Sequence, residues 1–295
     1  MSPAALRAMP LVFVLIWSTG FVVARLAMPH APPLSFLAIR FALSAICFAL
    51  WMRLAGVAWP RDRAQLGHLA VVGALMQVAY LGGVWTAVKH GLGAGTVALV
   101  VGLQPVLTAV WVSARGTGSG PGAVVGSQWA GLALGFVGLG LVVWNKLGAE
   151  MTAGNLGFAV AALAGITIGT LYQKRFVKAC DVRAASAVQM IAALAIAVPI
   201  ALVEPGTIDW RHPDFGIALA WSVLVLTLGG SSLLYLLIQR GEATAVTSLL
   251  YLVPPCTAAM AWVLFDEVVT PLMVAGMVAI AIGVALVMRT PRSSG

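Results

Sequence analysis

The sequence predicts an all-helical integral membrane protein of ten transmembrane helices, arranged as two inverted repeats of five helices. Three observations lead to this prediction: an apolar composition, ten long apolar segments, and a pattern that recurs in the two halves. Hydrophobic residues make up 61% of the 295 residues and charged residues only 9%, with a mean hydropathy of +1.01. A soluble fold has no core large enough for so much apolar surface, so we expect the chain to lie in a membrane.

Ten apolar segments are separated by polar or Gly/Pro-containing breaks. A helix needs about 20 residues to cross a bilayer, and most of the segments approach or reach that length. We expect the first segment to be a retained span and not a cleaved signal, because further spans follow immediately. In chain order the predicted spans are residues 8–28, 34–54, 67–88, 96–114, 128–143, 156–176, 185–203, 216–237, 245–265 and 271–288.

The positions of lysine and arginine predict the orientation of these spans. With the N-terminus inside, 12 of the 17 Lys and Arg residues fall in inside segments and 3 in outside loops, while Arg25 and Arg40 lie within spans. This asymmetry follows the positive-inside rule and predicts a bacterial-type inner membrane protein with both termini in the cytoplasm. It also argues against nucleic-acid binding, because the basic residues are scattered along one membrane face and do not form a patch with aromatic residues.

The two halves of the chain resemble each other. Three stretches match in the same order, which indicates an internal repeat with units at 1–150 and 151–295. Because each unit has an odd number of spans, we expect the second unit to be inverted relative to the first. The matching stretches are His90–Pro105 with Arg240–Pro255, residues 130–138 with 275–283, and Gly82-Gly83 with Gly229-Gly230.

Four motifs spread over both halves carry a resemblance to a known family. They are WSTGFVVARL at 17–26, PPLSFLAIRF at 32–41, GLGAGTVALVVGLQPVLTAV at 91–110 and LVPPCTAAMAWVLFDE at 252–267. In these motifs the chain resembles the drug/metabolite transporter superfamily, specifically the ten-span exporters built from two EamA domains. It is most similar to the aromatic amino-acid exporters of the YddG type. The resemblance implies a central cavity that spans one, three, four, six, eight and nine surround.

Glycine and proline residues at matching places in the two halves are predicted hinges. Pro105 and Pro255 each remove a backbone donor inside a span and bend its helix. Paired bends of this kind indicate a binding site near the middle of the membrane, although bends that only shape helix packing are the alternative. The glycine pairs allow either flexing or close helix contact. The predicted hinge residues are Gly82, Gly83, Pro105, Gly229, Gly230 and Pro255.

Polar residues inside the spans are few, and each is a candidate for substrate binding. Arg40 is the cation that we expect deepest in the membrane, where it binds a substrate carboxylate, acts as a gate or holds neighbouring helices together. Arg25 is expected to extend to the interface, and Gln189 marks the other predicted gate. An apolar cavity with aromatic walls suits a small amphipathic solute. The predicted substrate-binding residues are Trp17, Thr19, Arg40, Gln77, Tyr80, Gln104, Thr108, Trp111, Thr167, Ser231, Tyr235, Ser248 and Tyr251.

The fifth and tenth spans are predicted to form a peripheral scaffold. Small residues recur on one face of each, which lets membrane helices approach closely. We expect a monomer or a weak homodimer in contact with membrane lipid. The predicted small faces consist of Gly131, Gly135 and Gly138 on the fifth span and Ala275, Ala279 and Gly283 on the tenth.

Missing motifs narrow the function further. All nine acidic residues fall in loops or at span ends, which disfavours coupling to protons or sodium through an intramembrane carboxylate. No phosphate-binding Gly-Lys-Ser or Gly-Lys-Thr is present, and the three cysteines and four histidines are scattered, so neither ATP drive nor a metal or other cofactor is predicted. The spans contain no pairing of a nucleophile with a base, so we do not expect an enzyme.

The sequence therefore predicts a carrier that exports amino acids, aromatic or other neutral ones, or related small metabolites. The expected mechanism is alternating access by facilitated diffusion or exchange. The alternatives are an exporter of other metabolites or drugs that is coupled to protons and, less favoured by the paired bends, a channel.

Overall fold

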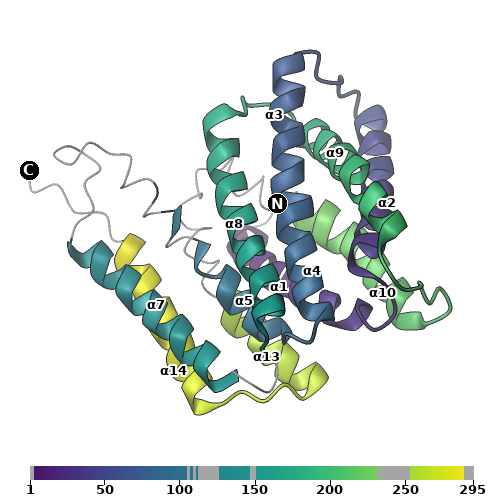
Figure 1. Cartoon of the computed structure of the whole chain (residues 1–295). Coiled ribbons are helices and arrows are strands. Elements are labelled where there is room, and N and C mark those ends of the chain that lie inside the picture. Colours follow the sequence, from purple (N-terminus) through teal and green to yellow (C-terminus); the bar gives the residue numbers. More distant parts are fainter. Residues whose placement is uncertain are drawn as a thin grey trace, which may run out of the picture.

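Every secondary-structure element in the described part of the computed structural model is a helix (Figure 1). The structure describes residues 3–104, 107–108, 111, 126–146, 151–230, 233 and 253–288. The elements are α1 (Pro3–Ala27), α2 (Pro33–Leu54), α3 (Arg63–Gly73), η1 (Ala74–Leu81), α4 (Gly82–Lys89), α5 (Ala94–Val101), α7 (Gly126–Lys146), α8 (Ala153–Phe176), α9 (Val182–Val203), α10 (Pro213–Ala220), η2 (Trp221–Gly230), α13 (Val253–Phe265) and α14 (Pro271–Met288).

Several of these helices are long and apolar enough to cross a membrane. Five such helical stretches are Pro33–Leu54, Arg63–Lys89, Ala153–Phe176, Val182–Val203 and Pro213–Gly230, and shorter apolar helices accompany them. Large apolar side chains cover much of their outward surface, including Leu54, Leu202 and Val203, each at least 79% exposed. Since water would disfavour such a surface, this pattern confirms the predicted all-helical integral membrane fold.

The two halves of the chain interleave around the centre of the molecule. α1 packs against α13 and η2, α2 packs against α9, and α8 packs against η1 and α4. Each of these contacts joins a helix before residue 150 to one after it, so the two halves share one interior. The largest buried side chains, such as Trp85, Phe36 and Leu92, lie in this shared core.

The third and eighth predicted spans share an unusual feature. In each span the α-helix gives way to a π-helical stretch, η1 in one and η2 in the other. Their first residues, Ala74 and Trp221, are 147 residues apart, as are Gly82 and Gly229. Because π-helical turns are rare and gather at functional sites, the matching pair points to the region between them.

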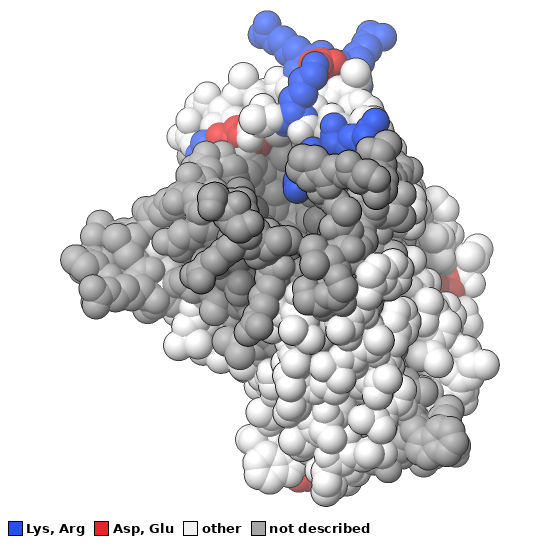
Figure 2. All heavy atoms as spheres, turned by 90° about the vertical axis from the view of Figure 1, so that its left-hand side faces the viewer, with Lys and Arg blue, Asp and Glu red and all other residues white. Residues whose placement is uncertain are grey.

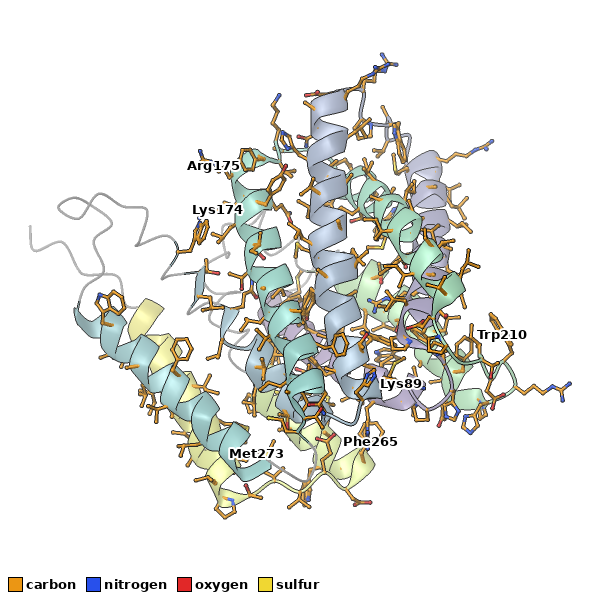
Figure 3. All side chains as sticks on the ribbon, in the orientation of Figure 1. Lys89, Lys174, Arg175, Trp210, Phe265 and Met273 are labelled. Atoms are coloured by element: carbon orange, nitrogen blue, oxygen red, sulfur yellow. The ribbon has the colours of Figure 1, made fainter. Side chains whose placement is uncertain are left out.

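Charge divides the molecule into two ends. Lys and Arg side chains gather at one end (Figure 2), which includes Lys174 and Arg175, whereas Lys89, Trp210 and Phe265 lie at the opposite end (Figure 3). We call the first the basic end; it is formed by the ends of α2 and α8 and the starts of α3 and α9. We call the second the acidic end. Its acidic residues are Glu204, Asp209, Asp214, Asp266 and Glu267.

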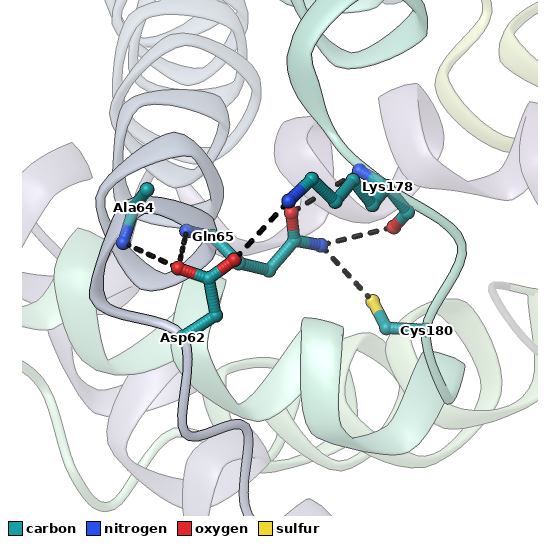
Figure 4. Close-up of polar contacts among 5 residues, drawn as sticks. All are labelled: Asp62, Ala64, Gln65, Lys178 and Cys180. Atoms are coloured by element: carbon teal, nitrogen blue, oxygen red, sulfur yellow. Dashed lines mark hydrogen bonds and ion pairs between the residues drawn. The ribbon is translucent and has the colours of Figure 1, made fainter.

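At the basic end, the connection between α8 and α9 binds the start of α3 (Figure 4). The buried Gln65 side chain donates to the Lys178 carbonyl at 2.9 Å and accepts from the Lys178 amide at 3.1 Å. Asp62 caps α3 by accepting from the amides of Gln65 and Ala64 and also pairs with the Lys178 ammonium at 3.4 Å. These hydrogen bonds, the one from Gln65 first, lower the pKa of the Asp62 carboxyl below its ordinary value of 3.8.

The acidic end is closed by aromatic packing between the halves. Phe36 of α2 stacks on Trp85 of α4, with ring centroids 4.5 Å apart, and meets the edge of Phe215 from α10 at 5.6 Å. All three side chains are buried. The carboxylates of Glu204 and Glu267 from the second half reinforce this closure.

α7 and α14 lie against each other beside the main body, at the lower left of Figure 1. A Cβ added to Gly138 would lie 2.7 Å from the Gly276 carbonyl oxygen, and one added to Gly283 would lie 2.5 Å from the Gly131 carbonyl oxygen. The two backbones therefore touch. The predicted face on α14 is partly wrong, because Gly276 and not the exposed Ala275 lies in the contact.

Candidate functional site

A cavity lies in the middle of the molecule, between the two π-helical stretches. Its volume is about 90 Å³, and α1, α2, η1, α4, α9 and η2 all contribute to its wall. Both halves of the chain thus form it. The lining residues are Trp17, Gly20, Phe21, Arg40, Met76, Gln77, Tyr80, Leu81, Val84, Trp85, Met190, Leu226 and Thr227.

The π-helical stretches supply the polar groups of the cavity next to Arg40. Gln77 and Tyr80 come from η1, and Thr227 comes from η2. Tyr80 and Thr227 are 147 residues apart, so they hold equivalent positions in the two stretches. A π-helical register brings residues i and i+5 into line, and in η2 the Thr227 hydroxyl accordingly donates to the Ser222 carbonyl at 2.8 Å.

Arg40 is the charged group of the cavity. Its side chain is 6% exposed, and its Nε and Nη2 atoms donate to the Thr227 hydroxyl oxygen at 3.4 Å and 3.2 Å. The guanidinium carbon lies 5.9 Å from the centre of the Trp85 ring. Across the described ranges, no carboxylate pairs with Arg40. A buried cation without a counter-ion costs several kcal/mol, so this site favours an anionic group of a ligand.

The guanidinium has more hydrogen-bond capacity than Thr227 uses. Arginine offers five N–H donors in a planar fork, and a carboxylate accepts from two of them at once. Gln77 and Tyr80 make no hydrogen bond to another described residue, and both line the cavity together with Arg40. Trp17, which packs on Phe13 with ring centroids 5.3 Å apart, adds an aromatic wall.

Four of the predicted binding residues therefore line the cavity: Trp17, Arg40, Gln77 and Tyr80. Two others lie elsewhere. The Thr19 hydroxyl donates to the Ile16 carbonyl and accepts from the Trp221 indole at 2.9 Å. The Thr167 hydroxyl donates to a carbonyl of its own helix, that of Leu163, at 2.7 Å.

Three predicted binding residues follow α5. Gln104 donates to the Thr170 hydroxyl at 3.1 Å and so links this segment to α8. The Thr108 hydroxyl donates to the Gln104 carbonyl, and Trp111 is 47% exposed. None of them is among the lining residues of the cavity. Ser231, Tyr235, Ser248 and Tyr251 lie outside the described residues.

The predicted hinges have varied surroundings. A Cβ on Gly83 would lie 2.7 Å from the Phe158 carbonyl oxygen, so this glycine lets α4 approach α8 closely, as the packing alternative holds. Gly82, Gly229 and Gly230 have only ordinary contacts around them. α5 ends at Val101, before the predicted break at Pro105, which lies outside the described residues. Pro255 is an exposed residue within the first turn of α13.

Sequence reasoning missed Thr227, Trp85 and Met190. The offset of 147 between the glycine pairs would have found Thr227, because it equates this residue with Tyr80. Trp85 and Met190 lie among many apolar residues of their spans, and nothing in the sequence distinguishes them. On α9, Met190 lines the cavity, whereas the Gln189 backbone packs against Gly73.

Two carboxylates of the second half bind helix starts of the first half at the acidic end. Glu204, at the end of α9, accepts from the amides of Leu34 and Ser35 at 3.1 Å and 2.9 Å and from the Ser35 hydroxyl. Glu267, after α13, accepts from the Ala94 amide at 2.9 Å. Anionic groups at helix N-termini are stabilising, so both contacts hold the halves together at this end.

The family model for the EamA-like transporter family matches the chain twice, at residues 8–144 and 153–289. The chain belongs to this family. The two matched ranges cover nearly all of it, and each includes one π-helical stretch. Family members are transporters, and the arrangement of a shared cavity between two similar halves agrees with that activity.

Curated relatives are similar along nearly their whole length. A protein of Escherichia coli named "Probable amino-acid metabolite efflux pump" is 26% identical over 92% of this chain and 91% of its own. A protein of Salmonella typhimurium with the same name is 26% identical over 97% of both chains. The "Uncharacterized transporter YvbV" of Bacillus subtilis is 25% identical over 97% of this chain and 92% of its own.

A solved crystal structure has the same fold. It superposes with a TM-score of 0.65 at 16% sequence identity and covers 97% of this chain and 96% of the other. At this identity the likeness concerns the fold alone.

Proposed function

We propose that this EamA-family transporter exports amino acids, aromatic or other neutral ones, or closely related metabolites, and that Arg40 binds the substrate carboxylate. The buried position of Arg40 carries the proposal, because Thr227 is its hydrogen-bond partner and no described carboxylate neutralises it. The names of the relatives from Escherichia coli and Salmonella typhimurium support the same substrate class.

The cavity wall suits the rest of such a substrate. Trp17, Phe21, Tyr80 and Trp85 supply aromatic surface, and Met76 and Met190 supply flexible apolar surface that adapts to different side chains. The Gln77 amide and the Tyr80 hydroxyl are positioned to orient the polar groups of an amino acid. A neutral amino acid thus meets one cation, two neutral polar groups and an apolar surround.

The volume of the cavity indicates that it opens during transport. Its volume of about 90 Å³ is small beside the ~300–1,000 Å³ of ordinary small-ligand pockets, so we expect the surrounding helices to move apart when an aromatic amino acid binds. Alternating access provides this movement, because the two halves rock about a fixed site between them.

We place the basic end in the cytoplasm according to the positive-inside rule, with both chain termini on that side and the two halves inverted. The acidic end then faces outward. It is closed by the Phe36, Trp85 and Phe215 cluster and by the Glu204 and Glu267 contacts. Export would require these contacts to separate while the hydrogen bonds of Gln65 at the basic end remain in place.

Uptake into proteoliposomes tests the proposal. Labelled phenylalanine, methionine and threonine are supplied outside vesicles with or without a pre-loaded unlabelled amino acid and with or without an imposed pH gradient. We expect saturable uptake. The pre-loaded amino acid should stimulate this uptake, and the pH gradient should leave it unchanged. Absence of uptake of every amino acid would contradict the proposed substrate class.

The same experiment distinguishes two other mechanisms. Uptake driven by the pH gradient would establish proton coupling, for which the described cavity wall offers no carboxylate. Linear, unsaturable flux without stimulation from the other side would indicate a channel. We favour a carrier over a channel because the cavity lies between two equivalent π-helical stretches. We favour an uncoupled carrier because the described cavity wall has no carboxylate.

A further inference from the structure

Three potential metal ligands from distant parts of the sequence meet at the acidic end. His30 lies between α1 and α2, whereas His212 and Asp214 lie at the start of α10. One ligand atom from each residue lies within 4.8 Å of the other two. His30 Nε2 and His212 Nδ1 are 3.8 Å and 3.7 Å from the same atom, Asp214 Oδ2.

The backbone holds these residues in place. The Asp209 amide donates to the His30 carbonyl at 2.8 Å, which joins the two connections directly. His212 is the N-cap of α10, so its position is fixed by the start of the helix. Gly206, at a φ of +115°, lets the preceding segment pass close to Pro32, whose Cγ would lie 3.2 Å from an added Cβ.

We propose that His30, His212 and Asp214 bind a divalent transition-metal ion. Two imidazoles and one carboxylate favour Zn²⁺, Co²⁺ or Ni²⁺ over Mg²⁺ and Ca²⁺, which take oxygen ligands. Bonds of ~2.1 Å from a tetrahedral ion place its ligand atoms about 3.4 Å apart. The two nitrogen–oxygen distances, 3.8 Å and 3.7 Å, therefore need to shorten by about 0.3–0.4 Å.

Small side-chain movements complete this geometry. The two imidazole rings are stacked, with centroids 3.6 Å apart and 14° between their planes, so they must turn for both lone pairs to meet one ion. His212 Nδ1 accepts a long hydrogen bond from the Asp214 amide at 3.3 Å, which a metal bond replaces. All three side chains are partly exposed, between 17% and 39%, so the ion enters from solution and water takes its remaining position.

The ligands come from both halves of the chain. His30 belongs to the first half, and His212 and Asp214 belong to the second, so a bound ion adds a link between the halves beside the Glu204 contact. Metal binding itself does not rest on the proposed transport function. It is measured without transport, so failure of one proposal is distinguishable from failure of the other.

Calorimetric titration tests the site. The full chain is purified in detergent without a histidine tag, stripped of metal, and titrated with ZnCl₂ or MgCl₂ near pH 7.5. We expect saturable binding of one Zn²⁺ per chain and no Mg²⁺ binding. His30→Ala, His212→Asn and Asp214→Asn should each weaken Zn²⁺ binding at least tenfold, and His212→Asn keeps a residue that caps helices well.

The matched control is His68→Ala at the basic end, where the His68 ring hydrogen-bonds with Tyr172 and lies outside the group. This variant should bind Zn²⁺ as the unmodified chain does. Absence of saturable Zn²⁺ binding, or binding that the three ligand variants leave unchanged, would overturn the proposal.

Discussion

Two helix pairs each join a span of the first half to the span at the equivalent place in the second half. The two pairs are held together in different ways. α7 and α14 touch through backbone at Gly138 and Gly283, and no polar contact between their described residues contributes. α2 and α9 pack against each other and are linked in addition by polar contacts at their ends. Glu204 binds the start of α2 at the acidic end, and the Arg183 guanidinium lies 5.7 Å from the Trp51 ring at the basic end.

From this difference we expect the α7–α14 pair to act as scaffold and the α2–α9 pair to move. Glycine contacts depend on a fixed separation of two backbones, so the α7–α14 pair tolerates little relative motion. End contacts of a few polar groups break and re-form at a modest cost. α2 and α9 also line the cavity with Arg40 and Met190, whereas no residue of α7 or α14 does. We therefore expect substitutions in the two pairs to affect different properties.

The largest expected effect concerns Arg40. Arg40→Ala should reduce transport at least tenfold, because it removes the carboxylate partner from the cavity. The melting temperature in detergent should change little, because loss of the hydrogen bonds to Thr227 is offset by removal of a buried charge that no described carboxylate neutralises. The matched control is Arg25→Ala in the last turn of α1, which is not a lining residue. Equal loss of transport in both variants would deny Arg40 a special role.

A bulky side chain in the scaffold pair should have the opposite profile. In Gly283→Leu the new side chain meets the backbone of Gly131 and Gly135, so we expect a loss of stability of about 1–3 kcal/mol or more. Thermal unfolding in detergent measures it. Gly140→Leu on α7 serves as the control, since nothing lies within 4 Å of a Cβ there. A stable Gly283→Leu variant would contradict the close backbone contact.

Glu204→Gln should have a smaller effect on the α2–α9 pair. The amide retains the shape but removes the charge from the start of α2, which we expect to cost about 0.5–2 kcal/mol. Ser35→Ala removes only the hydroxyl contact and should cost less. If Ser35→Ala is the more destabilising variant in thermal unfolding, the carboxylate is not the main link at this end.

The smallest effect should be a pH dependence at the basic end. Because the pKa of Asp62 is lowered in the folded state, its stabilising contribution is present above the ordinary value of 3.8 and disappears as the pH falls through the lowered pKa. Asp62→Asn should therefore lower the melting temperature slightly at pH 7, and this difference should shrink as the pH falls below 3.8. A difference that grows toward low pH would reverse the assigned sign.

Much of the fold follows from the sequence because membrane spans are long and uniform. The ends of α2, α8 and α9 lie within a few residues of the predicted limits, since lipid requires about 20 apolar residues in a helix. The π-helical stretches were not predicted. Their hydrogen-bond register depends on packing between helices, and only the glycine pairs at their ends hinted at them.

The candidate site was less predictable than the fold. Arg40, Gln77 and Tyr80 were found because polar residues are conspicuous in an apolar span. Thr19 and Thr167 have the same character, but their hydroxyls bind nearby carbonyls, and helix rotation decides which polar residues face inward. The proximity of His30 to His212 was also not predicted, because the two residues lie in connections between helices that are far apart in the sequence.

The most direct test of the central claim compares an amino acid with its amide. Trans-stimulated uptake of labelled methionine into proteoliposomes is measured with excess unlabelled methionine or methioninamide, in the unmodified chain and in Arg40→Ala. If Arg40 binds the carboxylate, methionine competes strongly, methioninamide competes at least tenfold more weakly, and Arg40→Ala loses this discrimination. Equal competition by the two compounds in the unmodified chain would contradict the account.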